Sequence, residues 1–166
     1  MATHVCDTLH QASMDGHPDC IRTLVDRGSN INEKIYGWPP LHVASRDGHQ
    51  DCILALLDRG ADINDMDMCG RTHLHYASRN GHQDCIQTLL DRDADVHQKD
   101  NSGWTPLHLA SAHGRQDCIR TLLDHDANIH EKNNDGSTPL ELANDETQAF
   151  ITQYLEEHEL PTKGVH

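Results

Sequence analysis

Aromatic side chains are scarce in this chain of 166 residues, where two tryptophans, three tyrosines and one phenylalanine make up 4%. Hydrophobic residues reach only 36%, so we expect packing among small aliphatic side chains rather than layers of large ones. The length suits one domain better than two. One architecture should therefore account for nearly the whole chain.

Positive charge is also scarce, with 13 Lys and Arg against 27 Asp and Glu and a net charge of −14. Such a surface repels the phosphate groups that dominate affinity for nucleic acids, so nucleic acid and anionic membranes are poor partners. No apolar run approaches the length of a transmembrane helix, and Met1 to Asp7 hold no stretch suited to a signal peptide. We expect a monomer in the reducing cytoplasm.

What the sequence does contain is a repeat. The triplet Asp-Cys-Ile recurs four times at spacings of 32, 33 and 33 residues, and a Leu-His pair keeps the same period. The triplets begin at Asp19, Asp51, Asp84 and Asp117, and the pairs at Leu9, Leu41, Leu74, Leu107 and Leu140, the last being Leu-Glu. Five units of about 33 residues follow.

The fourth unit shows how each one should fold. Thr105 is a good N-cap and Pro106 suits the first turn of a helix, because its missing N–H has no partner there. Gly114 permits the reversal that ends this helix, and a second helix with an apolar stripe starts near Gln116. The next unit opens at Gly136. Such a unit cannot bury its apolar face alone, so neighbouring units must stack.

The period and the string Thr105-Pro106-Leu107-His108-Leu109-Ala110 resemble the ankyrin repeat over roughly residues 5–155. The resemblance implies an all-α solenoid of stacked helix-turn-helix units with short β-hairpin loops. We assign an N-terminal cap to residues 1–30, internal repeats to about 34–66, 67–99 and 100–132, and a C-terminal cap to 133–155. Residues 156–166 carry no repeat pattern and form a tail.

Two of the units depart from the pattern where a helix pair begins. The second copy is one residue short between Asn32 and Gly37, so its hairpin should differ in shape from the others. Pro39 and His73 break the Thr-Pro pair in their own copies. Both departures fall in the N-terminal half of the solenoid.

A third departure concerns the residue that follows each second helix. Asp93 and Asp126 stand where Gly28 and Gly60 sit in the earlier copies. This position favours a left-handed backbone, which glycine adopts freely and aspartate only at some cost.

Six cysteines raise the question of disulfides or zinc. Four share one position of successive units, beside an isoleucine: Cys20, Cys52, Cys85 and Cys118. Packed helices lie roughly 8 to 10 Å apart, too far for a disulfide, which needs Cα atoms within about 7 Å. We therefore expect these four to pack in the core. Cys6 and Cys69 lie off this column, and Cys69, beside a hairpin tip, is the better candidate for a reactive thiol.

Fifteen histidines suggest metal binding or a pH response. No Cys-x-x-Cys or His-x-x-x-His pair appears, so we expect no metal site, while a change of surface charge around pH 6 stays open as an alternative. The resemblance implies another role for His10, His42, His75 and His108, namely hydrogen bonds between repeats.

Catalysis is a remote alternative. Members of each acidic column, such as Asp19 and Asp51, lie a full repeat apart, too far to act as a carboxylate pair or to gather around calcium. No Ser-His-Asp constellation or phosphate loop is present. We predict no catalytic residue and no cofactor.

The resemblance implies that a partner protein, either an extended segment or a domain, contacts the hairpin tips and first helices, which form a concave face. Trp38, Arg71 and Trp104 share one slot after the hairpin glycine in three units, and such residue types are enriched at binding hot spots. Asn32 and Asn64 also resemble ankyrin sites of asparaginyl hydroxylation. The predicted partner-binding residues are Tyr36, Trp38, Arg46, Met66, Met68, Arg71, Arg79, Lys99, Trp104, His113 and Lys132.

Overall fold

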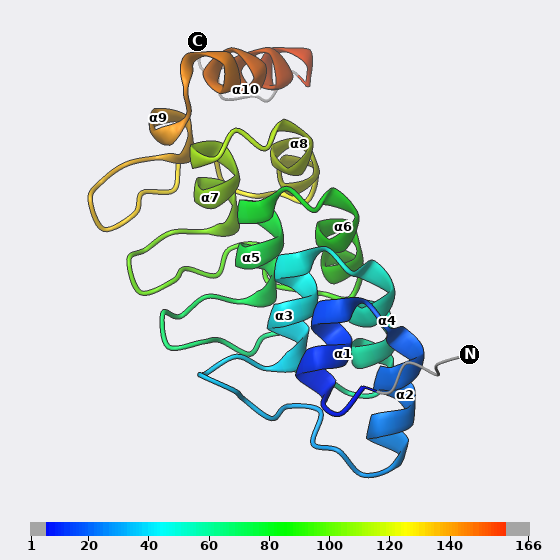
Figure 1. Ribbon diagram of the computed structural model, residues 1–166. Helices are drawn as coiled ribbons and strands as arrows, with labels where there is room; N and C mark the ends of the chain where they lie inside the picture. Colours follow the sequence, from blue (N-terminus) through cyan, green and yellow to red (C-terminus); the bar gives the residue numbers. More distant parts are fainter. Residues whose placement is uncertain (1–5, 159–166) are drawn as a thin grey trace.

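The computed structural model describes residues 6–158, and within them ten helices form five consecutive pairs (Figure 1). The pairs are α1 (Leu9–Asp15) with α2 (Pro18–Asp26), α3 (Pro40–Asp47) with α4 (Gln50–Asp58), α5 (His73–Asn80) with α6 (Gln83–Asp91), α7 (Pro106–Ala112) with α8 (Gln116–Asp124), and α9 (Pro139–Leu142) with α10 (Asp145–Glu157). The predicted all-α solenoid of five helix pairs is confirmed.

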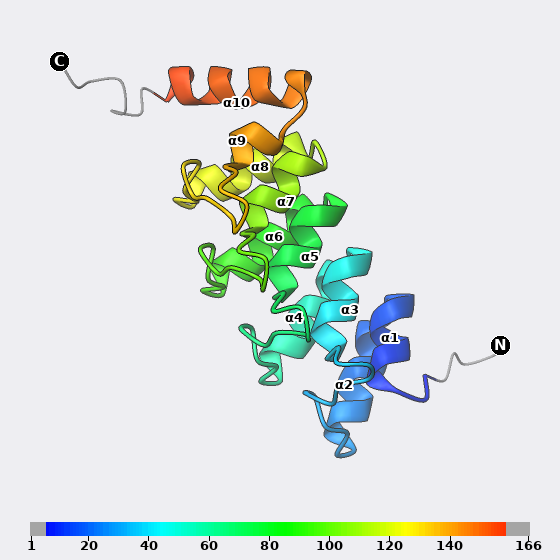
Figure 2. The same ribbon diagram turned by 90° about the vertical axis from the view of Figure 1, so that its left-hand side faces the viewer.

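The pairs stack in two rows. The first helices pack in the order α1, α3, α5, α7 and α9, and α2, α4, α6 and α8 form the second row behind them. The loops that join one pair to the next all project to the same side (Figures 1 and 2). The first helices and these loops therefore form one continuous face.

The core runs between the two rows and repeats like the sequence. Ile21, Ile53, Ile86 and Ile119 are fully buried on successive second helices, opposite Leu41, Leu74 and Leu107 on the first helices. Of the cysteine column, Cys52, Cys85 and Cys118 are buried and Cys20 is half-buried, so these thiols lie where a core position was predicted.

The start signals of the helices act as expected. The Thr105 hydroxyl accepts the His108 N–H (3.3 Å), and Pro106 occupies the first turn of α7. Asp93 and Asp126 both have φ of 68°, which confirms the left-handed backbone expected at that slot.

The loops are hairpin-shaped but contain no strand within residues 6–158, apart from one isolated bridge between Ile35 and Trp38. In three loops a polar side chain reinforces a backbone hydrogen bond between the two arms, such as the one from the Asp67 N–H to the Arg71 carbonyl oxygen (3.0 Å). The carboxylate of Asp67, for example, accepts the backbone N–H groups of Cys69 (2.9 Å) and Arg71 (3.0 Å). Asp100 and Asn133 do the same in the next two loops.

The first loop has the different shape that its missing residue predicts. Ile35 and Trp38 exchange two backbone hydrogen bonds of 3.0 Å, and the turn between them is made by Tyr36 and Gly37 alone. Both central residues have positive φ, 53° for Tyr36 and 82° for Gly37, as a type I′ turn requires. This tight turn places Ile35, Tyr36 and Trp38 beside α1 and α3, where they line one pocket.

The last unit departs from the repeat after Leu142. Ala143 is extended, and the Asn144 side chain then accepts the Thr147 N–H (2.8 Å) and starts α10, which packs on α8 and α9. Helix α10 ends at Glu157, two residues inside the segment assigned to the tail. The remainder of that tail, 159–166, and residues 1–5 of the N-terminal cap lie outside the described residues.

Candidate protein-binding surface

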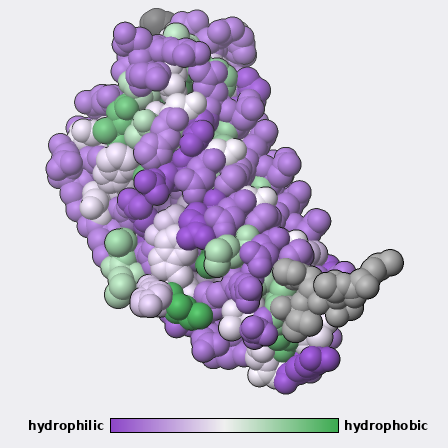
Figure 3. Space-filling model, viewed as in Figure 1, coloured by the Kyte–Doolittle hydropathy of each residue, from purple (hydrophilic) through white to green (hydrophobic). Residues whose placement is uncertain are grey.

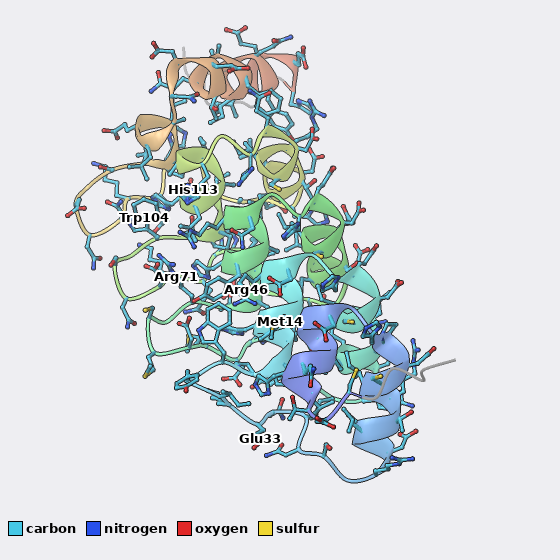
Figure 4. The ribbon with its side chains drawn as sticks, viewed as in Figure 1. Met14, Glu33, Arg46, Arg71, Trp104 and His113 are labelled. Carbon is cyan, nitrogen blue, oxygen red and sulfur yellow. The ribbon has the colours of Figure 1, made fainter. Side chains whose placement is uncertain are left out.

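The predicted binding residues all belong to the first helices or to the loops. Tyr36, Met66, Met68, Lys99 and Lys132 lie in loops, Arg46 and Arg79 lie near the ends of α3 and α5, His113 caps α7, and Trp38, Arg71 and Trp104 precede the first helices. Figure 4 shows that labelled members of the set follow the same side of the solenoid from Arg46 to His113.

One pocket of about 400 Å³ lies at the N-terminal end of this face, between α1, the first loop and α3. Its lining is mostly apolar and includes three of the predicted residues. The lining residues are His10, Met14, Ile35, Tyr36, Trp38, Val43 and Arg46. Pockets with mostly apolar walls and a few polar groups commonly hold ligand groups, so this pocket is a candidate binding site.

Exposed hydrophobic side chains surround the pocket and continue to the second loop. Tyr36 is 91% exposed and Met68 79%, and Met14, Ile35 and Met66 are also exposed. Hydrophobic surface is visible at the lower left of Figure 3, and further hydrophobic areas lie higher on the same view. Apolar side chains gathered at the surface in this way mark interaction sites.

Trp38 is held in place from three sides. Its ring centroid lies 4.4 Å from that of Tyr76 and 5.7 Å from that of His42, and the Arg46 guanidinium lies 5.3 Å from its centroid. The side chain is half-buried, so it both packs between repeats and presents a surface to the pocket. A fixed aromatic wall costs little entropy when a ligand binds.

The basic side chains of the face mostly have acidic partners within the chain. Arg46 donates to Asp47 (2.7 and 2.9 Å), and Arg71 donates to Asp100 (3.3 Å), whose carboxylate is only 4% exposed. Lys99 likewise pairs with Glu131. Much of the positive charge predicted for this face is therefore neutralised, and the apolar pocket is its more distinctive feature.

Arg79 is engaged differently from the other basic residues. Its Nε donates to Nε2 of His113 (3.2 Å). Burial, together with the positive charges of Arg79 and Arg115, lowers the pKa of His113. His113 is therefore held neutral as an acceptor.

A family model described as ankyrin repeats, three copies, matches residues 6–67, 65–133 and 94–162. The chain belongs to the ankyrin-repeat family. Ankyrin repeats generally mediate binding to other proteins and are typically not enzymatic. Comparison with curated proteins gives no match.

The histidine column of this ankyrin-repeat protein makes the inter-repeat hydrogen bonds that the resemblance implied. Nε2 of His10, His42, His75 and His108 faces, respectively, the carbonyl oxygen of Trp38 (2.6 Å), Arg71 (2.8 Å), Trp104 (2.8 Å) and Ser137 (3.0 Å). Burial lowers the pKa of three of these rings, that of His75 to about 4 and those of His42 and His108 in the same direction. The rings of His75 and His108 are therefore neutral at physiological pH.

The remaining sequence-based candidates are dispersed over the ankyrin-repeat protein. Among residues 6–158, no three side chains of His, Cys, Asp or Glu converge on a point that could hold a metal ion, and no helix is both long and apolar enough to cross a membrane.

Cys69 is exposed and Cys6 is buried. The Asn32 side chain accepts the Asp62 N–H (3.1 Å), and its hydroxylation stays a prediction.

Sequence reasoning about this ankyrin-repeat protein missed part of the pocket. Met14, Ile35 and Val43 line it but were not among the predicted residues. The sequence held a signal for two of them. Met14 falls in the same repeat position as Arg46, and Ile35 lies inside the shortened loop.

Proposed function

We propose that this ankyrin-repeat protein is a non-enzymatic binding module whose partner protein places a large apolar side chain in the pocket between α1, the first loop and α3. The partner continues as an extended segment or a domain surface along the first helices toward Trp104 and Lys132. The observation that carries this proposal is the conformation of Tyr36.

Tyr36 has two properties that do not stabilise the fold. Its φ of 53° is unfavourable for a large L side chain, and its side chain is 91% exposed, so burial does not compensate for the strain. Strained residues of this kind cluster at binding and active sites. Here the strained residue lines the pocket itself, which supports a role in binding.

Selection of peptides from a random display library on the purified protein tests the proposal without knowledge of the partner. We expect enriched peptides to share a large apolar residue and to perturb the NMR signals of Met14, Tyr36 and Trp38. Loss of binding on Trp38→Ala, with the fold retained, supports the pocket. Peptides that perturb only the α2–α4–α6–α8 side would overturn it.

A matched pair of variants separates binding from stability. Tyr36→Asn relieves the left-handed strain, because asparagine tolerates this conformation, and it removes the ring from the pocket. Asp93→Gly relieves similar strain after α6, outside the pocket lining. We expect both variants to melt at higher temperature, but only Tyr36→Asn to bind the selected peptides more weakly. Equal peptide affinity in the two variants would contradict the role of Tyr36.

A further inference from the structure

Two buried histidines face each other across the interface between α3 and α5. Nδ1 of His42 lies 2.5 Å from Nδ1 of His73, with the ring centroids 4.3 Å apart and the ring planes at 87°. Neither residue exposes any surface to solvent. The contact therefore has to be satisfied by protons that the two rings themselves carry.

The regular repeats show which donor normally forms a hydrogen bond with Nδ1 of this histidine. Nδ1 of His75 accepts the backbone N–H of Thr72 (3.1 Å), and Nδ1 of His108 accepts that of Thr105 (3.1 Å). Each of these rings is thus a neutral imidazole that accepts at Nδ1 and donates at Nε2. The Thr residue that caps the helix supplies the donor within the same repeat.

The two departures from the Thr-Pro pair meet at His42. Pro39 occupies the capping position of α3 and has neither an N–H nor a hydroxyl, so His42 lacks the local donor that the other repeats have. His73 occupies the proline position of the next repeat and turns its ring toward Nδ1 of His42. His73 thus gives Nδ1 of His42 a hydrogen-bond partner in place of the local donor that Pro39 lacks.

A count of protons shows what this partner must carry. Nε2 of His42 lies 2.8 Å from the Arg71 carbonyl oxygen, and Nε2 of His73 lies 2.8 Å from that of Asp62. A carbonyl oxygen only accepts, so each Nε2 must carry a hydrogen. Two neutral imidazoles have only these two hydrogens, which leaves two lone pairs facing each other at 2.5 Å. Three hydrogen bonds require a third proton.

We propose that His42 and His73 bind one proton between their Nδ1 atoms and act as a single imidazole–imidazolium pair that joins the second repeat to the third. Nδ1 of one ring donates to Nδ1 of the other, and both Nε2 atoms keep their bonds to the carbonyl groups. The pair carries one positive charge. This assignment depends on the hydrogen-bond geometry alone and is independent of the partner proposed above.

Nearby carboxylates favour a positive charge on the pair, whereas burial opposes it. The carboxylates of Asp65 and Asp67, on the second loop, favour a positive charge at His42, whereas Lys34, on the first loop, opposes it and is itself paired with Asp65 at 2.8 Å. Burial lowers the pKa of His42 and, together with charge on His42, lowers that of His73 well below its ordinary value. The two rings therefore do not become charged together.

The proton bears on the pocket because Trp38 packs directly on His42. Their ring centroids are 5.7 Å apart, and Trp38 lines the pocket on its other side. A positive charge on the pair lies behind this aromatic wall and acts on the Trp38 ring, whose centroid also lies 5.3 Å from the Arg46 guanidinium. The protonation state of the pair is thereby linked to the electrostatics of the pocket, and Trp38 can report it.

NMR of the full chain with ¹⁵N-labelled histidine tests the proposal directly. We expect one strongly deshielded N–H proton that correlates with Nδ1 of His42 and His73, and ¹⁵N shifts of both rings that change together as the pair takes up a single proton. Two rings that titrate independently, or that both stay neutral down to the pH of unfolding, would refute the shared proton. A zinc-dependent shift of both Nδ1 signals, with no deshielded proton in its absence, would replace the proton by a metal and also refute it.

Two variants provide the matched comparison. His73→Pro removes the pair, and Pro39→Thr combined with His73→Pro gives the second and third repeats the Thr-Pro pair that the fourth already has. The double variant should fold even if the single one does not, because His42 regains a local donor. We expect the deshielded proton to be absent from both.

Trp38 fluorescence gives a second readout, because protonated histidine quenches a neighbouring indole. In a Trp104→Phe background, which leaves Trp38 as the only tryptophan, we expect emission to fall when the pair takes up its proton. The same background carrying the double substitution should show no such step. An identical step in both proteins would overturn the link between the pair and the pocket.

Discussion

Acidification should destabilise this protein through its buried histidines, and His75 allows the effect to be calculated. Burial lowers the pKa of His75 from 6.5 to about 4. Between these two values the unfolded chain binds a proton that the native chain does not, so stability is retained above pH 6.5 and is lost as the pH falls toward 4. From pH 7 to pH 5, His75 alone should remove about 2 kcal/mol from the free energy of unfolding. The pKa of His108 shifts in the same direction.

Urea unfolding at pH 7, 6 and 5 measures this loss. His75→Gln keeps a side-chain acceptor for the Thr72 N–H, as in a capping box, but removes the titrating ring. We expect the loss between pH 7 and pH 5 to be about 2 kcal/mol smaller in this variant than in the native chain. His97→Gln, at an exposed position, serves as the control. If His75→Gln shows the same pH dependence as the native chain, the neutral buried ring is not the cause.

Three further outcomes test the packing. Asp93→Gly and Asp126→Gly should each raise the free energy of unfolding by about 1 kcal/mol, because glycine removes the cost of a φ of 68°; urea titrations that show no gain in either would count against this. Cys69 should react with thiol reagents much faster than Cys85, which is buried and whose pKa burial raises to about 12; equal rates would refute the burial. Cys85→Ser should lower stability by about 1–3 kcal/mol, because its hydroxyl enters an apolar layer, and an unchanged melting temperature would contradict this.

The sequence by itself determined the architecture of this protein. A period of about 33 residues with capping Thr-Pro pairs specifies both helices of a unit, since each signal acts within a few residues of the chain. The burial of Cys52, Cys85 and Cys118 followed from the same regularity. Equivalent residues of stacked repeats lie at the interface between neighbouring units, where apolar side chains are buried. The different shape of the first loop was also predictable from one missing residue.

The pocket could be predicted only in part. Tyr36, Trp38 and Arg46 were expected on the concave face because they lie on a hairpin tip or a first helix. Met14, Ile35 and Val43 join them only when the tight turn is folded beside α1 and α3. The sequence also gave no sign that most of the basic residues on this face are paired within the chain. Ion pairs between loops depend on which neighbouring side chains meet in space.

The meeting of His42 with His73 is what only the tertiary structure decided. In the sequence, Pro39 and His73 were two separate departures from the Thr-Pro pair, 34 residues apart. Stacking of α5 on α3 brings the ring of His73 to the nitrogen that Pro39 leaves without a donor. Pro39 removes a donor within its own repeat, but the atom left without that donor, Nδ1 of His42, meets His73 of the next repeat. Buried hydrogen-bonding groups are paired through space rather than along the chain.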